Sequence, residues 1–426
     1  MSRKIGFWPV FALVTGSQIG SGVFMLPASL APYGGYSLLG WIISGLGAIA
    51  LALVFAQLCN WIPKTGGPHA YVQEAFGSTA SFFVGWTYWV ISWVSTTAVI
   101  VTSIGYLGPI IGVHSTEVTL LLEILLVLLI TALNLRGIKA AGSAEFILTA
   151  LKIIPLVLMP LAAFMYFNAE NIAVAPAIES LPAPHILSQV TLLTLWGFVG
   201  LESATTPAQS VVNPEKTIPR AIILGTISVA ILYFFNSLGI LGVIPSAELA
   251  NTSAPYSAAA QYIFGGNWHL MISLIASIVC IGTLNAWMLA SGQIALGLSE
   301  DGLMPRFFSK KNKFEAPYMS LLISCAGIIP LLMLTADKNL AQQMTTIIDF
   351  SVVAFLFVYL SCCLSFLKLL PGKKMARFWP LAYGIAALLF CSWVIYETSL
   401  ATILVASLFT LCGIPVYFYR KHKGLM

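Results

Sequence analysis

The chain has 426 residues, of which 59% are hydrophobic and only 8% are charged, and its mean hydropathy is +0.93. Soluble domains carry about 25% charged residues, so this composition excludes a soluble protein and indicates a polytopic membrane protein. The net charge of +5 does not indicate nucleic-acid binding, because the basic residues lie in short loops between apolar segments. The seven cysteines lack CxxC spacing, and no phosphate loop or nucleophile motif is present, so we expect no metal site, no cofactor and no enzyme.

The apolar segments predict an all-α bundle of about twelve membrane-spanning helices without an appended soluble domain. The first segment follows a basic start, but it is too long for a signal peptide and has no cleavage site, so we expect it to be the first span. The predicted spans are residues 7–31, 36–60, 79–108, 117–135, 144–167, 187–207, 218–243, 269–298, 317–335, 345–367, 376–397 and 399–419.

Lysine and arginine gather in every second loop, which predicts that both termini are cytoplasmic. The outer loops hold only Lys338, with Glu170, Glu179, Glu248 and Asp337. The short tails and the absence of a signal peptide favour a bacterial inner membrane. The basic residues of the inner loops are Lys64, Arg136, Lys139, Lys216, Arg220, Arg306, Lys310, Lys311, Lys313, Lys368, Lys373, Lys374, Arg377, Arg420, Lys421 and Lys423.

Polar and glycine residues interrupt the first span at residues 15–24, TGSQIGSGVF. Glycine lowers helix stability by about 1 kcal/mol, and polar side chains in hydrocarbon need partners. Irregular backbone at this depth survives only where it is buried in protein or lines a wet cavity. We therefore predict that the helix breaks at Gly20-Ser21-Gly22. The alternative is close helix packing through small residues.

A second interruption, residues 195–207 with sequence LWGFVGLESATTP, lies in the sixth span. If spans one to five form one unit and spans six to ten form another, each unit begins with an interrupted helix. Because each unit has an odd number of spans, the second unit crosses the membrane in the opposite direction to the first. Paired interruptions of this kind indicate a transporter site near the membrane midplane. We predict one domain, 1–426, with repeats at 1–167 and 187–367 and two extra helices at 376–419. A channel filter or charged ring is not evident.

With both interruptions, the chain resembles the amino acid–polyamine–organocation transporter superfamily, and within it the basic amino acid/polyamine antiporters such as the arginine–agmatine exchanger. The resemblance covers nearly the whole chain and implies a LeuT-like 5+5 inverted repeat with broken helices one and six. The expected partners are an amino acid or amine, protons, the lipid bilayer and a second copy of the chain, and no nucleic acid. The motifs that carry the resemblance are residues 20–24 with Pro27, 63–71, 196–203, 213–214, 219–221, 290–293 and 301–305.

A broken helix offers complements to both charged groups of an amino acid. Backbone N–H groups at the start of the second half-helix suit a carboxylate, and freed carbonyls at the end of the first half suit an ammonium group. Glycine lets the solute reach the backbone, although Gly20 and Gly22 could also serve packing alone. The predicted substrate-binding residues are Ser17, Gln18, Ile19, Gly20, Ser21, Gly22, Val23, Trp196, Phe198, Val199, Gly200 and Trp287.

The resemblance implies gating roles for four aromatic residues. Trp196 would cover the substrate, and Trp287 would stack on a cationic side chain, a contact worth about 0.5–2 kcal/mol. Tyr88 and Tyr359 match gate tyrosines of the exchangers. Ordinary lipid or helix packing is the alternative for the tryptophans.

Glu202 and Lys152 are two charged residues within the predicted spans for which we expect a role in gating or coupling. The resemblance gives Glu202 a place in proton-dependent gating, whereas a neutral carboxyl hydrogen-bonded between helices is the alternative. The Lys152 ammonium would replace the sodium ion of sodium-coupled relatives, which implies sodium independence. Lys152 could then release a proton during transport or brace the Gly20 region as a static ammonium, and both alternatives stay open.

The chain departs from the arginine exchanger at several positions. Thr96 takes the place of an asparagine that contacts the guanidinium, and Ser17 that of an asparagine before the first break. Asp349, expected near the inner part of the tenth span, would suit a cationic side chain, and Ser351 lies close to it in sequence. Thr96, Asp349 and Ser351 form the expected side-chain pocket, while no role is assigned to Glu123.

We therefore expect sodium-independent exchange of an amino acid for a related amino acid or its decarboxylated amine, by alternating access. Proton-coupled symport on the same fold is the alternative, and Lys152 favours it. A channel, a sensor and the light subunit of a complex are further alternatives. The loop between spans three and four has no cysteine for attachment of a heavy subunit.

Overall fold

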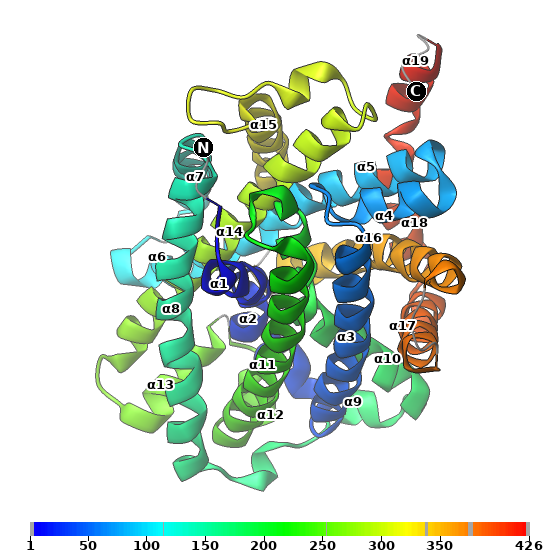
Figure 1. The fold of residues 1–426 in the computed structure, drawn as a ribbon. Helices are drawn as coiled ribbons and strands as arrows, with labels where there is room; N and C mark the ends of the chain where they lie inside the picture. The colour runs from blue at the N-terminus through cyan, green and yellow to red at the C-terminus, as the bar shows by residue number, and fades with distance from the viewer. Residues whose placement is uncertain (1–3, 114, 253, 337–339, 374–377, 423–426) are drawn as a thin grey trace.

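The computed structural model describes residues 4–113, 115–252, 254–336, 340–373 and 378–422. Within these ranges the chain is helical, with a single isolated β-bridge between Ile5 and Val211. Figure 1 shows both ends of the chain at the same end of the bundle. Five charged loop residues used for the topology lie outside the described residues: Asp337, Lys338, Lys374, Arg377 and Lys423.

The predicted twelve spans correspond to eleven described helical segments long enough to cross a membrane and one shorter apolar helix, Tyr318–Leu334. Helices dominate because each backbone N–H and C=O in lipid needs a partner within the protein. Apolar side chains such as Leu129, Leu161 and Leu404 are exposed on the outside of the bundle. They are placed to face lipid tails.

The first half of the chain contains nine α- and 3₁₀-helices among the described residues, and two of its spans are each built from more than one helix. They are α1 (Phe7–Gln18), α2 (Ser21–Leu30), η1 (Ala31–Tyr33), α3 (Tyr36–Trp61), α4 (Pro68–Phe76), α5 (Ser78–Val94), α6 (Thr96–Ile111), α7 (Thr116–Asn134) and α8 (Ile138–Ala163).

Short helices connect the two halves of the chain and break up the sixth span. They are η2 (Phe164–Tyr166), η3 (Ala169–Asn171), α9 (Pro176–Glu179), α10 (Ala183–Leu195), η4 (Trp196–Phe198), η5 (Ser203–Thr205) and η6 (Ala208–Ser210).

The remaining helices complete the second half and the C-terminal pair of spans. They are α11 (Pro214–Val243), α12 (Ser246–Leu249), α13 (Pro255–Phe264), α14 (Trp268–Glu300), η7 (Arg306–Ser309), α15 (Tyr318–Thr335), α16 (Leu340–Leu369), η8 (Leu370–Gly372), α17 (Phe378–Glu397), α18 (Leu400–Leu411) and α19 (Ile414–His422).

The two interrupted spans occupy related places in the bundle. Helix α1 packs against α11, α8 and α14, while α10 packs against α3 and α16. Helix α14 also contacts α6, and α16 contacts α5. These reciprocal contacts are compatible with the predicted inverted repeat, which stays a prediction. Both interruptions are therefore enclosed by protein, as irregular backbone at membrane depth requires.

Candidate functional site

The first span is interrupted between α1 and α2, and the predicted broken helix is confirmed. Helix α1 ends at Gln18 and α2 begins at Ser21, so the break is at Ile19–Gly20. A Cβ atom at Gly20 would lie 2.6 Å from the Thr283 side chain on α14. The φ of Gly20 is −152°, an angle that any residue can adopt, so this backbone angle does not require glycine. Glycine is needed here for the close approach of α14.

The last carbonyl groups of α1 have no partner within their own helix, and four other side chains bind them. Lys152 Nζ donates to the Gly16 carbonyl at 2.8 Å, and Trp287 Nε1 donates to the Ser17 carbonyl at 3.3 Å. The Tyr233 hydroxyl donates to the Gln18 carbonyl at 2.6 Å, and Thr283 Oγ1 donates to the Ile19 carbonyl at 2.5 Å. The donors come from α8, α11 and α14. Each carbonyl oxygen has two lone pairs, so a substrate ammonium group can bind beside one of these donors or replace it.

The opposite side of the break is the N-terminal end of α2, where no side chain caps the helix. The backbone N–H groups of a first helical turn lack intrahelical acceptors and carry the positive end of the helix dipole. The Ser21 hydroxyl lies here and accepts a 3.3 Å hydrogen bond from Trp196 Nε1. This end of the site can bind an anionic group such as a carboxylate.

The sixth span loses its regular helix where Trp196 begins. Helix α10 ends at Leu195 and is followed by separate 3₁₀ turns up to Ser210. Gly200 has a φ of +104°, which favours glycine, and a Cβ atom there would lie 2.9 Å from Ser17 Cβ. Ser17 and Ser203 hydroxyls hydrogen-bond at 2.8 Å and tie the two interruptions together.

A small cavity of about 20 Å³ lies between the two interruptions. This volume is close to that of one water molecule, so an amino acid enters only if neighbouring side chains move. Its lining residues are Ser17, Gln18, Gly20, Ser21, Gly22, Ser95, Val99, Trp196, Val199, Thr283 and Trp287.

Eight of the predicted substrate-binding residues line this cavity, and four do not. Ile19, Val23, Phe198 and Gly200 are buried beside it. Ser95, Val99 and Thr283 also line the cavity and were not predicted. Ser95 lies at the junction of α5 and α6, and this junction places Ser95, rather than the expected Thr96, at the cavity. Thr96 hydrogen-bonds to the Trp93 carbonyl instead.

Aromatic side chains separate this cavity from Glu202. Trp287 packs on Phe355 with ring centroids 5.3 Å apart, and Phe355 contacts both Tyr88 and Tyr359 at 6.2 Å. The Tyr359 hydroxyl donates to Glu202 Oε2 at 2.6 Å. Three of the four aromatic residues predicted as gates, Trp287, Tyr88 and Tyr359, thus form a continuous group through Phe355, which was not predicted. Their function as gates stays a prediction.

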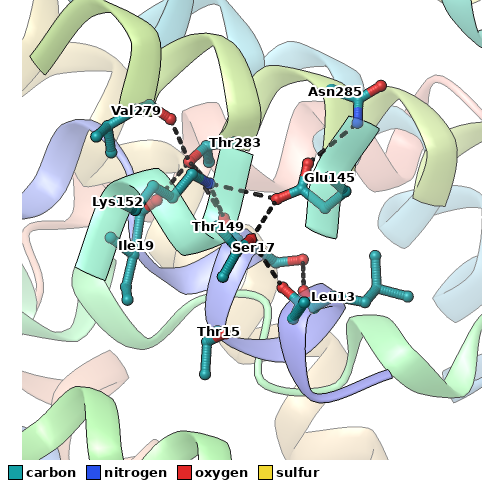
Figure 2. Close-up of polar contacts among 12 residues, drawn as sticks. Leu13, Thr15, Ser17, Ile19, Glu145, Thr149, Lys152, Val279, Thr283 and Asn285 are labelled. Atoms are coloured by element: carbon teal, nitrogen blue, oxygen red, sulfur yellow. Dashed lines mark hydrogen bonds and ion pairs between the residues drawn. The ribbon is translucent and has the colours of Figure 1, made fainter. Parts of the chain in front are cut away.

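Lys152 on α8 is fully buried. Its ammonium group contacts α1 and α14 (Figure 2). Besides the Gly16 carbonyl, its ammonium group contacts Thr283 Oγ1 at 3.1 Å and Glu145 Oε1 at 3.4 Å. Glu145 was not predicted as a site residue. The contact with an anionic partner is compatible with the static brace, and both the brace and proton release stay predictions.

A second cavity of about 300 Å³ contains Asp349. It is lined by Tyr33 after α2, by α10 from His185 to Leu193, and by Glu397 at the end of α17. With the predicted topology these ends lie at the outer face. Asp349 then lies near the outer and not the inner part of its span, which corrects that expectation. In this topology α16 runs from the outer to the inner face. Neither Asp349 nor Ser351 lines the central cavity.

Comparison with known proteins identifies the family. The family model described as "Amino acid permease" matches residues 5–418. The chain belongs to the amino acid permease family. The permease is a multi-pass membrane transporter and not an enzyme.

Curated relatives match the permease over almost its full length. The putrescine transporter PotE of Haemophilus influenzae is 28% identical over 429 residues, covering 99% of this chain and 98% of the relative. PotE of Escherichia coli K12 is 28% identical, with coverages of 98% and 96%. The cadaverine/lysine antiporter of Escherichia coli K12 is 30% identical, with coverages of 92% and 89%. The predicted resemblance to basic amino acid/polyamine antiporters is confirmed.

Proposed function

We propose that the permease exchanges a basic amino acid for a diamine across the membrane by alternating access at the central cavity. The observation that carries this proposal is the arrangement of the α1–α2 break. Backbone carbonyls of α1 and backbone N–H groups of α2 meet at a cavity covered by Trp196 and Trp287. The relatives are named as a putrescine transporter and as a cadaverine/lysine antiporter, which supports amines as substrates.

The two ends of the break would treat an amino acid and a diamine differently. Both substrates carry an ammonium group that the carbonyl end of α1 can accept, since Ser17 and Gln18 present their carbonyls there. Only the amino acid has a carboxylate for the N-terminal end of α2, whose dipole repels a second ammonium group. A diamine would therefore bind mainly through α1, with its other end toward the aromatic side chains of Trp287 and Phe355.

We also propose that transport is independent of sodium and that protons are not co-substrates. The Lys152 ammonium already supplies a cation between α1, α8 and α14, and Glu145 balances its charge. Proton-coupled symport is not favoured, because a named antiporter is among the relatives. A bacterial inner membrane, cytoplasmic termini and a homodimer remain parts of the proposal.

Reconstitution into liposomes tests the exchange. Vesicles would be loaded with lysine, cadaverine, putrescine, ornithine, arginine, agmatine or buffer, and uptake of each labelled compound followed in sodium or choline medium. We expect uptake only into vesicles loaded with an amine or an amino acid. The rate of uptake should be the same in sodium and choline media. Uptake into empty vesicles that requires an imposed pH gradient would indicate proton symport, and a requirement for sodium would contradict the role given to Lys152.

A further inference from the structure

Glu145 is a buried carboxylate with both oxygens engaged. Oε1 contacts Lys152 Nζ at 3.4 Å and accepts from Thr149 Oγ1 at 3.1 Å, while Oε2 accepts from Asn285 Nδ2 at 3.0 Å (Figure 2). Glu145 precedes Lys152 by seven residues on α8, so the two lie on one helix face two turns apart. The lysine side chain extends back along the helix toward Glu145, as helical side chains do.

The Glu145 carboxylate lies directly against α1. A Cβ atom at Gly16 would be only 2.2 Å from Glu145 Oε1. The Thr149 hydroxyl also lies 3.3 Å from the Ala12 carbonyl, so its one hydrogen is shared between that carbonyl and Glu145 Oε1. The backbone of α1 therefore approaches the carboxylate at a position where a larger residue would collide with it.

The pair is isolated from other compensating charges. Among the described residues, Glu145 is the one carboxylate within ion-pair distance of Lys152. Charged side chains within the membrane persist only when they are paired or hydrated. Loss of the Glu145 charge would thus leave a buried ammonium group without an anion beside the substrate-binding end of α1.

The network continues from Glu145 to two further helices. Asn285 on α14 donates to Glu145 and to the Ala141 carbonyl, and its own oxygen accepts from Asn134 on α7 at 3.1 Å. Helices α7, α8 and α14 therefore hold Glu145 in one orientation. This fixed carboxylate can in turn fix the direction of the Lys152 ammonium group.

We propose that Glu145 is a positioning residue for transport: its carboxylate holds the Lys152 ammonium group on the Gly16 carbonyl and so fixes the carbonyl end of α1 at the substrate cavity. Glu145 touches no substrate in this proposal. The inference rests on the proposed function, because the group it positions is the one expected to bind the substrate ammonium.

A double-mutant cycle tests the proposal in exchange-active liposomes. The variants are Glu145→Gln, Lys152→Met and both together, with Glu145→Asp retaining the charge and Glu123→Gln as a matched control. Glu123 is a buried carboxylate on α7 that makes no hydrogen bond among the residues that the structure describes. Glu145→Gln should raise the KM for the amine by about tenfold, equivalent to about 1.4 kcal/mol, and Glu145→Asp should recover most of this loss. Glu123→Gln should stay within about twofold of wild type.

The double variant gives the decisive comparison, because neutralising both partners leaves no uncompensated charge. Its KM should be no higher than that of the worse single variant. The proposal would be overturned if the two substitutions raised the KM independently, so that the KM increase of the double variant equalled the product of the two single increases. It would also be overturned if the KM of Glu145→Gln stayed within about twofold of wild type. If Glu145→Gln does not fold, Lys152→Met and the double variant carry the comparison, and a double variant with a higher KM than Lys152→Met would then overturn the proposal.

Melting temperatures of the same purified variants provide a readout that does not need transport. The double variant should melt above Glu145→Gln, and a lower melting temperature in the double variant would contradict the pairing. If the wild-type protein melts cooperatively but exchanges no amine, the proposed function is refuted. The melting temperatures of the variants would then still test the Glu145–Lys152 pairing.

Discussion

The Lys152 ammonium group donates to the Gly16 carbonyl across 2.8 Å, two residues before α1 ends. A side chain from α8 thereby binds a backbone group that the interrupted helix leaves without a partner. The contact joins a charged network to the place where the substrate is expected to bind. Changes that displace α1 from this network should therefore affect transport even though they lie outside the cavity.

Replacement of Gly16 by alanine is a direct way to displace α1. The new Cβ would collide with Glu145 Oε1 and would lie 2.7 Å from Thr149 Oγ1. Overpacking of this kind costs about 1–3 kcal/mol, so we expect a lower melting temperature and a fall in exchange of about tenfold. Gly142→Ala on α8 is the matched control, since no atom lies within 4 Å of a Cβ there. Equal effects of the two substitutions on exchange would show that the contact with Glu145 is unimportant.

Trp196→Leu should impair exchange because it removes the side chain that covers the central cavity. The substitution removes the indole that lines the cavity and its hydrogen bond to the Ser21 hydroxyl. Loss of one positioned contact to the substrate site should lower the exchange rate by about tenfold or more while the fold persists. Initial rates in liposomes give the measurement, and Trp379→Leu, an exposed tryptophan on α17, gives the control. Normal exchange by Trp196→Leu would mean that the cavity is not the transport site.

The sequence predicted the spans and both interruptions because composition controls them. Twenty apolar residues determine a membrane helix wherever its neighbours lie, and glycine with polar residues at mid-depth marks a break. The break at Ile19–Gly20 came one residue earlier than the predicted Gly20-Ser21-Gly22, because Ser21 already begins α2. Helix ends depend on local hydrogen bonds that composition does not specify.

The missed site residues depend on tertiary contacts. Thr283 reaches the cavity because α14 crosses the break in α1, and no local pattern indicates that crossing. Ser95, and not the predicted Thr96, lies at the cavity because α5 ends at Val94 and α6 begins at Thr96. Glu145 is different: its spacing of seven residues from Lys152 puts both on one helix face, so the sequence alone could have indicated the pair.

Tyr359→Phe should weaken the contact beneath the cavity. The tyrosine hydroxyl donates to Glu202 Oε2 and accepts from the Gly200 backbone N–H at 3.3 Å. A buried polar group that loses its partner costs about 1–3 kcal/mol, so the melting temperature should fall. Exchange should fall with it if Glu202 and Tyr359 form a gate. Tyr396→Phe is the control, because Tyr396 is exposed and should leave both measurements unchanged. A normal melting temperature for Tyr359→Phe would show that the hydrogen bond contributes no stability.

Asp349→Asn should change transport from one side of the membrane only. Asp349 lies with Glu397 in the cavity of about 300 Å³ at the predicted outer face, away from the central site. A carboxylate there attracts cationic substrates, so its loss should raise the KM for outside diamine by about two- to fivefold at low salt. The effect should shrink when salt shortens the screening length to about 8 Å or less. Right-side-out and inside-out membrane vesicles compare the two faces, with the exposed Glu117→Gln as control. An equal change of KM at both faces would place Asp349 in the central site instead.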